Sequence, residues 1–202
     1  MNRAKLLLGG VAAMLLGIAG LVVAIPADQK LGELLKLVLF HGASTWANLV
    51  AFSLTAVLAA AFLLTRSEGV WRWESAFRTI AVPLWVVNTG LGVLSMYLSW
   101  GGFLWSEPRM RMTLWILLAS FAVVAVHLAF ERPRLTALFD IALAVVVFGS
   151  IGLTPKVFHP DNPVMHSGGT IIALFGGLVA ACTIAALLGG ALLAGRTRAV
   201  RP

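Results

Sequence analysis

Residues 168–194 read GGTIIALFGGLVAACTIAALLGGALLA, a run of 27 residues without a charged side chain. An α-helix needs about 20 mainly apolar residues to cross the hydrocarbon core of a bilayer. Five other apolar stretches, each bounded by charged residues, proline or glycine, lie near residues 6–24, 34–64, 79–99, 112–130 and 135–153. The sequence therefore predicts an all-α fold, a polytopic membrane bundle of about six transmembrane helices in a single domain over residues 1–202.

The composition favours a membrane protein over a nucleic-acid-binding one. Hydrophobic residues make up 60% of the chain and charged residues only 11%, whereas a soluble domain carries about 25% charged residues. A formal net charge of +7 would suit a nucleic-acid partner, but no basic run alternates with aromatic residues. We therefore expect this chain to contact the lipid bilayer and no nucleic acid.

The distribution of basic residues predicts which side of the membrane each connection faces. Ten of the 15 Lys and Arg residues lie at the two termini or in the connections 65–78 and 131–134. Because Lys and Arg collect in cytoplasmic loops, we expect both termini in the cytoplasm, as an even number of helices requires. The protein then resides in a bacterial inner membrane, with the connections 25–33, 100–111 and 154–167 facing outward.

Three of the four histidines are predicted near the outer face. His41 lies at the outer end of the second apolar stretch, and His159 and His166 lie in the connection 154–167. The fourth, His127, is expected near the inner end of the fourth helix. An aromatic loop on the outer side, residues 99–112, reads SWGGFLWSEPRMRM.

This outer loop contains Trp100, Trp105, Glu107, Arg109 and Arg111. One interpretation is an interfacial belt, where tryptophan commonly lies and where arginines contact lipid head groups or form a weak surface ion pair. The other is a haem site. Haem iron takes two axial imidazoles, its flat macrocycle needs aromatic cover, and its propionates suit arginine. The residues themselves leave both interpretations open.

The loop resembles the hallmark of the CcmC/CcsA haem-handling proteins of cytochrome c biogenesis, an outward segment of the form W-G-x-x-W-x-W-D-x-R-x-T. Trp100 opens the loop, Glu107 stands where the family has Asp, and Arg109 stands where it has Arg. The chain departs from the pattern at Phe103 and Ser106.

The histidine segments are similar to those of the same family. His41 is followed by Trp46 five residues later, and His159 is followed by Pro160. The order of histidine, tryptophan loop and histidine across six helices covers nearly the whole chain. The resemblance implies non-covalent haem b with His41 and His159 as axial ligands, and His166 as the competitor for the second position.

The resemblance also implies a function in haem delivery rather than catalysis. Haem held at the outer face would be presented to a periplasmic haem chaperone or an apocytochrome c, with ABC transporter subunits as further partners. Two other functions stay open. One is a haem-free membrane subunit that scaffolds a respiratory or transport complex, and the other is a b-type haem membrane anchor that oxidises quinol.

Two polar residues are expected inside predicted helices. Asn88 lies in the middle of the third helix, where an amide usually forms a hydrogen bond to another helix. Asp140 lies near the inner end of the fifth helix, and we expect Arg132 and Arg134 to screen its charge.

Overall fold

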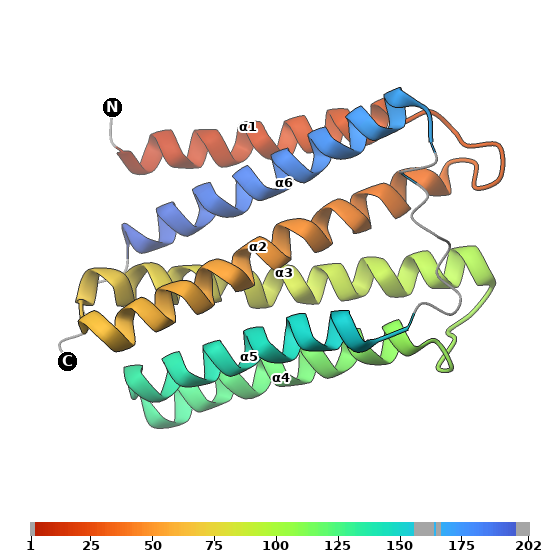
Figure 1. Cartoon of the computed structure of the whole chain (residues 1–202). Coiled ribbons are helices and arrows are strands. Elements are labelled where there is room, and N and C mark those ends of the chain that lie inside the picture. Colours follow the sequence, from red (N-terminus) through yellow and green to blue (C-terminus); the bar gives the residue numbers. More distant parts are fainter. Residues whose placement is uncertain (1–2, 156–163, 165–166, 197–202) are drawn as a thin grey trace.

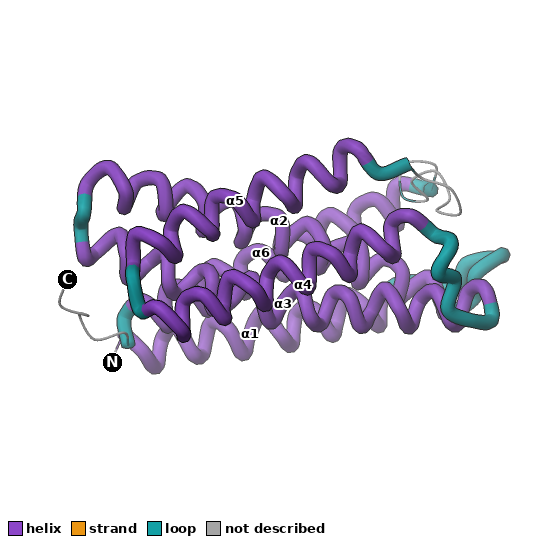
Figure 2. Tube along the Cα trace, turned by 90° about the horizontal axis from the view of Figure 1, so that it is seen from below, coloured by secondary structure: helices purple, strands orange, loops and turns teal. Residues whose placement is uncertain are grey.

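The computed structural model describes residues 3–155, 164 and 167–196, which form an all-helical bundle (Figures 1 and 2). The helices of this described part are α1 (Arg3–Ala24), α2 (Leu34–Thr65), α3 (Glu68–Trp100), α4 (Pro108–Phe130), α5 (Pro133–Leu153) and α6 (Gly169–Ala194). All six are long and apolar enough to cross a membrane. The chain is therefore a polytopic membrane protein with an all-α fold, as the sequence predicts.

The helices run alternately in opposite directions, and α2 lies at the centre of the bundle (Figure 1). It contacts α3, α6 and α5, and more lightly α1. The outer helices pack in pairs, α1 against α6 and α4 against α5, while α3 also contacts α4 and α6. Only two residues join α2 to α3 and α4 to α5, and such short connections require the helices on either side to be antiparallel.

A stripe of small residues lets α2 occupy this central position. Ala43, Ala47, Ala51, Thr55 and Ala59 recur every four residues, and all are buried. Residues four apart lie on the same face of a helix. Lipid chains are as apolar as leucine, so helices in a bilayer associate largely through close packing of such small side chains. The stripe therefore supplies a surface against which neighbouring helices can approach closely.

Aromatic residues fill the interface between α2, α3 and α4. The rings of Phe52 and Trp85 meet edge to face, with centroids 5.8 Å apart. The indole Nε1 of Trp85 donates a hydrogen bond to the carbonyl oxygen of Thr113, at 3.2 Å. A buried indole usually needs such a partner, and here the bond joins α3 to α4.

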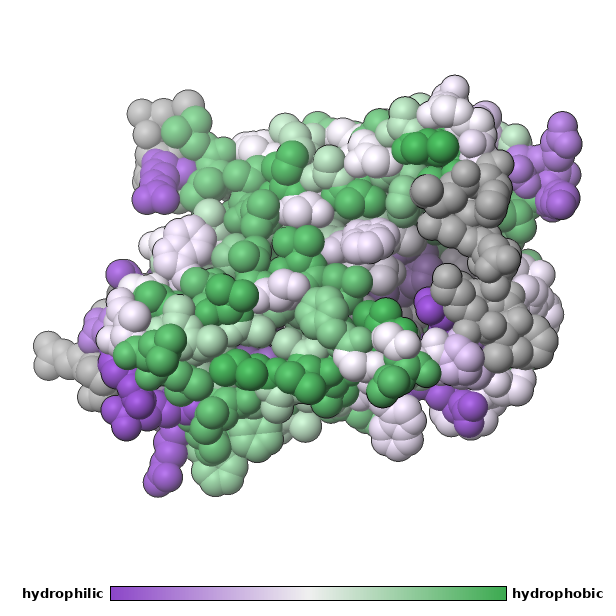
Figure 3. Space-filling view, in the orientation of Figure 1, coloured by the Kyte–Doolittle hydropathy of each residue, from purple (hydrophilic) through white to green (hydrophobic). Residues whose placement is uncertain are grey.

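Polar surface collects at the two ends of the bundle, and the space-filling view shows a mainly hydrophobic band between them (Figure 3). Both described chain ends lie at one end, together with the α2–α3 and α4–α5 connections (Figure 1). The α1–α2 and α3–α4 connections lie at the opposite end. This grouping of the connections agrees with the sequence prediction.

Two helices begin four or more residues before the predicted position. Helix α3 begins at Glu68 rather than at residue 79, so the expected loop 65–78 is wrong, and only residues 66–67 connect α2 to α3. Charged side chains made this segment look like a loop, but some of them pair inside the bundle. Helix α4 begins at Pro108 rather than at residue 112, which reduces the tryptophan-rich loop to residues 101–107. Proline suits the first position of a helix because that residue needs no amide hydrogen.

Candidate functional site

The end of the bundle opposite the chain termini contains the described residues of the predicted haem site. His41 lies near the start of α2, Trp100 is the last residue of α3, and Glu107 directly precedes α4. His159 and His166 lie outside the described residues. The fold therefore brings the first predicted ligand and the tryptophan loop to one end of the molecule, and the second ligand stays a prediction.

The imidazole of His41 packs against a glycine of α3. A Cβ atom placed on Gly92 would lie 3.1 Å from Cε1 and 3.5 Å from Nε2 of His41. Both distances are to the half-buried ring itself, so a larger residue at position 92 would displace it. By contrast, a Cβ atom on Gly90 meets nothing within 4 Å. Gly92 thus provides the space in which the His41 ring lies.

Polar side chains continue from His41 into the interior of the bundle. The hydroxyl oxygens of Ser44 and Thr45 lie 2.6 Å and 3.0 Å from Oδ1 of Asn88, and 2.8 Å and 3.0 Å from the carbonyl oxygen of His41. Asn88 therefore bonds across to another helix, which confirms the prediction made for it. These bonds fix the turn of α2 that carries His41 against α3.

Asn48 extends this polar face by one further turn of α2. It is fully buried, and neither atom of its side-chain amide has a hydrogen-bond partner among the described residues. Its neighbours on the same face of α2 both contact α3. One turn earlier, Ser44 forms a hydrogen bond to Asn88, and one turn later, Phe52 packs on Trp85. Burying a polar group without a hydrogen-bond partner lowers the stability of the fold. Tight packing of α2 on α3 does not require an amide at this position.

The short loop between α3 and α4 has a defined structure. Gly101 ends α3 with a φ of 75°, a conformation that glycine adopts readily, and its amide donates to the Tyr97 carbonyl. The amide of Leu104 donates to the Met96 sulfur at 3.0 Å. The ring centroids of Phe103 and Trp105 lie 5.6 Å apart, and Trp105 is 61% exposed. The loop therefore presents an exposed aromatic pair on an anchored backbone.

Glu107 and the two arginines that follow it have different environments. Glu107 is fully buried and caps α4, where its Oε1 accepts a hydrogen bond from the Arg109 amide at 3.2 Å. Arg111 is exposed, whereas Arg109 is half-buried and its Nε, itself buried, has no hydrogen-bond acceptor among the described residues. The two terminal nitrogens of an arginine can in general bind a carboxylate with two hydrogen bonds.

Trp46 does not share the face of α2 that carries His41. Five residues turn an α-helix by about 140°, and the Trp46 side chain is 56% exposed on the outside of the bundle. The contribution of Trp46 to the haem site therefore stays a prediction, because its side chain points away from the face that carries His41.

A buried charge cluster at the other end of the bundle was missed from the sequence. The Nη1 atom of Arg78 lies 2.9 Å from Oε1 of Glu74 and 2.8 Å from Oδ2 of Asp140. All three residues are buried. Asp140 thus pairs with Arg78 of α3, rather than with Arg132 or Arg134, which are exposed. The four-residue spacing of Glu74 and Arg78 was the signal that could have indicated a helical ion pair.

Aromatic residues surround this cluster on the side of α4. The guanidinium of Arg78 lies 5.3 Å from the centroid of the Trp71 ring, a cation–π arrangement. His127 lies on Trp71 at 6.2 Å between centroids, and its Nδ1 is 3.4 Å from the Thr136 hydroxyl. His127 is therefore a packed residue far from the predicted haem site, consistent with the inner position expected for it.

The described residues at this end supply three of the groups that the predicted haem site calls for. They offer one imidazole at His41, an aromatic pair in the loop, and a buried guanidinium nitrogen without an acceptor at Arg109. Within residues 3–155, 164 and 167–196, no cluster of three or more His, Cys, Asp or Glu side chains could hold a metal ion.

No protein-family model matches this chain, and no curated protein matches it.

Proposed function

We propose that this protein binds haem b at the end of the bundle that carries His41 and the 101–107 loop, and presents it for cytochrome c maturation. The observation that carries the proposal is the presence of two groups at that end, one on α2 and one at the start of α4. A histidine ring is accommodated by a glycine of the neighbouring helix, and the half-buried Arg109 has no acceptor for its Nε. An imidazole suits haem iron, and an arginine suits a propionate.

The distribution of basic residues supports an orientation with this end on the outer side of a bacterial inner membrane. The termini and their neighbouring connections carry most of the Lys and Arg, and such segments stay in the cytoplasm. Both termini are then cytoplasmic, and the haem site faces the compartment in which c-type cytochromes are assembled.

Each residue has a specific role in this proposal. His41 provides one axial imidazole, and His159 or His166 provides the other. Trp100 and Trp105 cover the apolar macrocycle, and Arg109 and Arg111 bind the propionates. Glu107 acts indirectly, because its carboxylate caps α4 and so holds Arg109 in place.

The function is delivery rather than catalysis. Exchangeable axial ligands at an exposed end suit transfer of intact haem to a periplasmic haem chaperone or an apocytochrome c, with ABC transporter subunits as associated proteins. The polar groups named at this end serve to hold a ligand, and the proposal requires no bond to be made or broken in the haem itself.

Haem content of purified variants tests this proposal. We expect His41→Ala to lose most of its haem, and His127→Ala, which alters a histidine at the opposite end, to keep wild-type content. His159→Ala and His166→Ala are compared in the same way, and the one that loses haem identifies the second ligand. If all three outer-histidine variants keep wild-type haem content, the ligand assignment is wrong.

A second pair of variants tests the site without removing any ligand. Gly92→Val introduces a Cβ atom 3.1 Å from the His41 ring, whereas Gly90→Val, on the same helix, meets nothing within 4 Å. We expect only the first to reduce haem content or to shift the Soret maximum. Equal effects of both variants would show that the environment of His41 does not matter for haem binding.

A further inference from the structure

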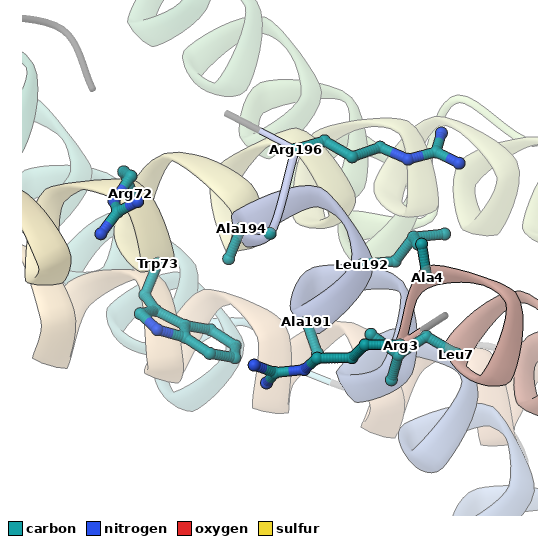
Figure 4. Close-up of a pocket in the computed structure, with 10 residues that line it drawn as sticks. Arg3, Ala4, Leu7, Arg72, Trp73, Ala191, Leu192, Ala194 and Arg196 are labelled. Carbon is teal, nitrogen blue, oxygen red and sulfur yellow. The ribbon is translucent and has the colours of Figure 1, made fainter. Parts of the chain in front are cut away.

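A pocket at the end of the bundle that carries both termini lies far from the proposed haem site. It has a volume of about 340 Å³ and lies where the start of α1, the start of α3 and the end of α6 meet (Figure 4). Its polar lining consists of three arginines, one from each of these segments: Arg3, Arg72 and Arg196.

The pocket has an excess of positive charge that no described acidic side chain pairs with. Its lining contains no Asp or Glu, and none of the three arginines forms an ion pair with any other described residue. The ends of α1 and α6 carry opposite partial charges and largely cancel here. The three guanidinium groups therefore decide the electrostatics, and an anion is the ligand they favour.

The three arginines line the pocket from different segments and do not all point the same way. Figure 4 shows the Arg3 side chain reaching from α1 toward Trp73 of α3, while Arg196 extends in the opposite direction. Guanidinium groups bind phosphate oxygens through paired hydrogen bonds.

The remaining walls are apolar and aromatic. Leu7 of α1 and Ala191 and Leu192 of α6 form the apolar part of the lining. The Trp73 ring is 37% exposed and stacks on the buried Phe77 with centroids 6.1 Å apart. A tryptophan at the head-group level with apolar side chains beside it is typical of the membrane interface. The pocket thus combines a site for a head group with a surface for an acyl chain.

We propose that this pocket binds the phosphate of an anionic glycerophospholipid, with its acyl chains along Leu7 and Leu192. Basic pockets between transmembrane helices bind acidic lipid head groups in this way. Inorganic phosphate shares the head-group chemistry but would not use the apolar wall. The lipid is therefore favoured over the free ion, and this site is independent of the haem site.

The test is lipid binding to the purified full-length chain, measured by native mass spectrometry in detergent. Short-chain phosphatidylglycerol is compared with phosphatidylcholine of the same chain length and with inorganic phosphate. The pocket variant is Arg3→Gln/Arg72→Gln/Arg196→Gln. The matched control is Arg66→Gln/Arg132→Gln/Arg134→Gln, which removes the same charge at the same end of the bundle without altering the pocket lining.

We expect wild-type protein to prefer phosphatidylglycerol, and the pocket variant to bind it about 100-fold more weakly, or about fivefold for each arginine removed. The control should bind like wild type. Equal losses in both variants, or equal binding of phosphatidylcholine, would overturn the proposal. Displacement of the lipid by inorganic phosphate at equal concentration would overturn the lipid assignment and identify a soluble anion instead.

Discussion

Replacing Arg78 by methionine removes the only cation from the buried cluster on α3 and α5. Arg78 lies within 2.9 Å of Glu74 and within 2.8 Å of Asp140, and all three side chains are at most 5% exposed. The methionine keeps part of the apolar stem but leaves two carboxylates facing each other. Removing one partner of a buried ion pair typically costs about 3–5 kcal/mol, and we expect a loss of unfolding free energy in this range.

Asp140→Asn is expected to cost much less, although it alters the same cluster. The Glu74–Arg78 pair then remains balanced in charge, and the new amide oxygen can still accept a hydrogen bond from Arg78. A loss of about 1 kcal/mol is expected for exchanging a charged acceptor for a neutral one. The triple variant Glu74→Gln/Arg78→Met/Asp140→Asn carries no charge and should recover much of the loss seen for Arg78→Met.

The unfolding free energy of each variant is measured by titration with sodium dodecyl sulfate in mixed micelles, followed by circular dichroism. Arg134→Met makes the same exchange at an exposed position at the same end of the bundle, and we expect it to stay within about 0.5 kcal/mol of wild type. The reasoning is refuted if Arg78→Met costs no more than Asp140→Asn, or if the triple variant is less stable than Arg78→Met.

Two further predictions concern helix packing and the α1–α2 loop. Gly190→Ala places a Cβ atom 2.7 Å from the Phe77 ring, which should cost about 1–3 kcal/mol in the same titration; Gly9→Ala has open space and should not destabilise. The backbone N–H of Leu31 lowers the pKa of Asp28 from 3.8, so the loop bond should persist at neutral pH and break as the pH falls through the lowered value. A titration midpoint of the Leu31 amide shift at or above 3.8 would contradict this.

The membrane-spanning helices were predictable because long apolar runs are a local property of the sequence. Residues 168–194 contain no charge and form α6 nearly as predicted. Helix α3 was predicted too short, because Glu74 and Arg78 look solvent-exposed in a sequence window. Their burial depends on Asp140, which lies 62 residues after Arg78 in the chain, and no local pattern indicates that pairing.

The candidate site was predictable in part for the same reason. The position of His41 near the end of a helix follows from local hydrophobicity, and so does the loop that contains Trp105. The contact between His41 and Gly92 joins two helices. Residue spacing in the sequence does not indicate which residue of α3 lies against His41. Likewise, Asn88 was expected to bond across helices, but its partners Ser44 and Thr45 became known only from the packing.

The most direct test of haem binding is an optical spectrum of the detergent-purified protein, recorded oxidised and then after reduction with dithionite. The proposal predicts a Soret band and sharp α and β bands in the reduced state, as expected for six-coordinate haem b with two imidazole ligands. A featureless spectrum that persists after haem is added would contradict the proposal and would leave a haem-free membrane scaffold as the better account.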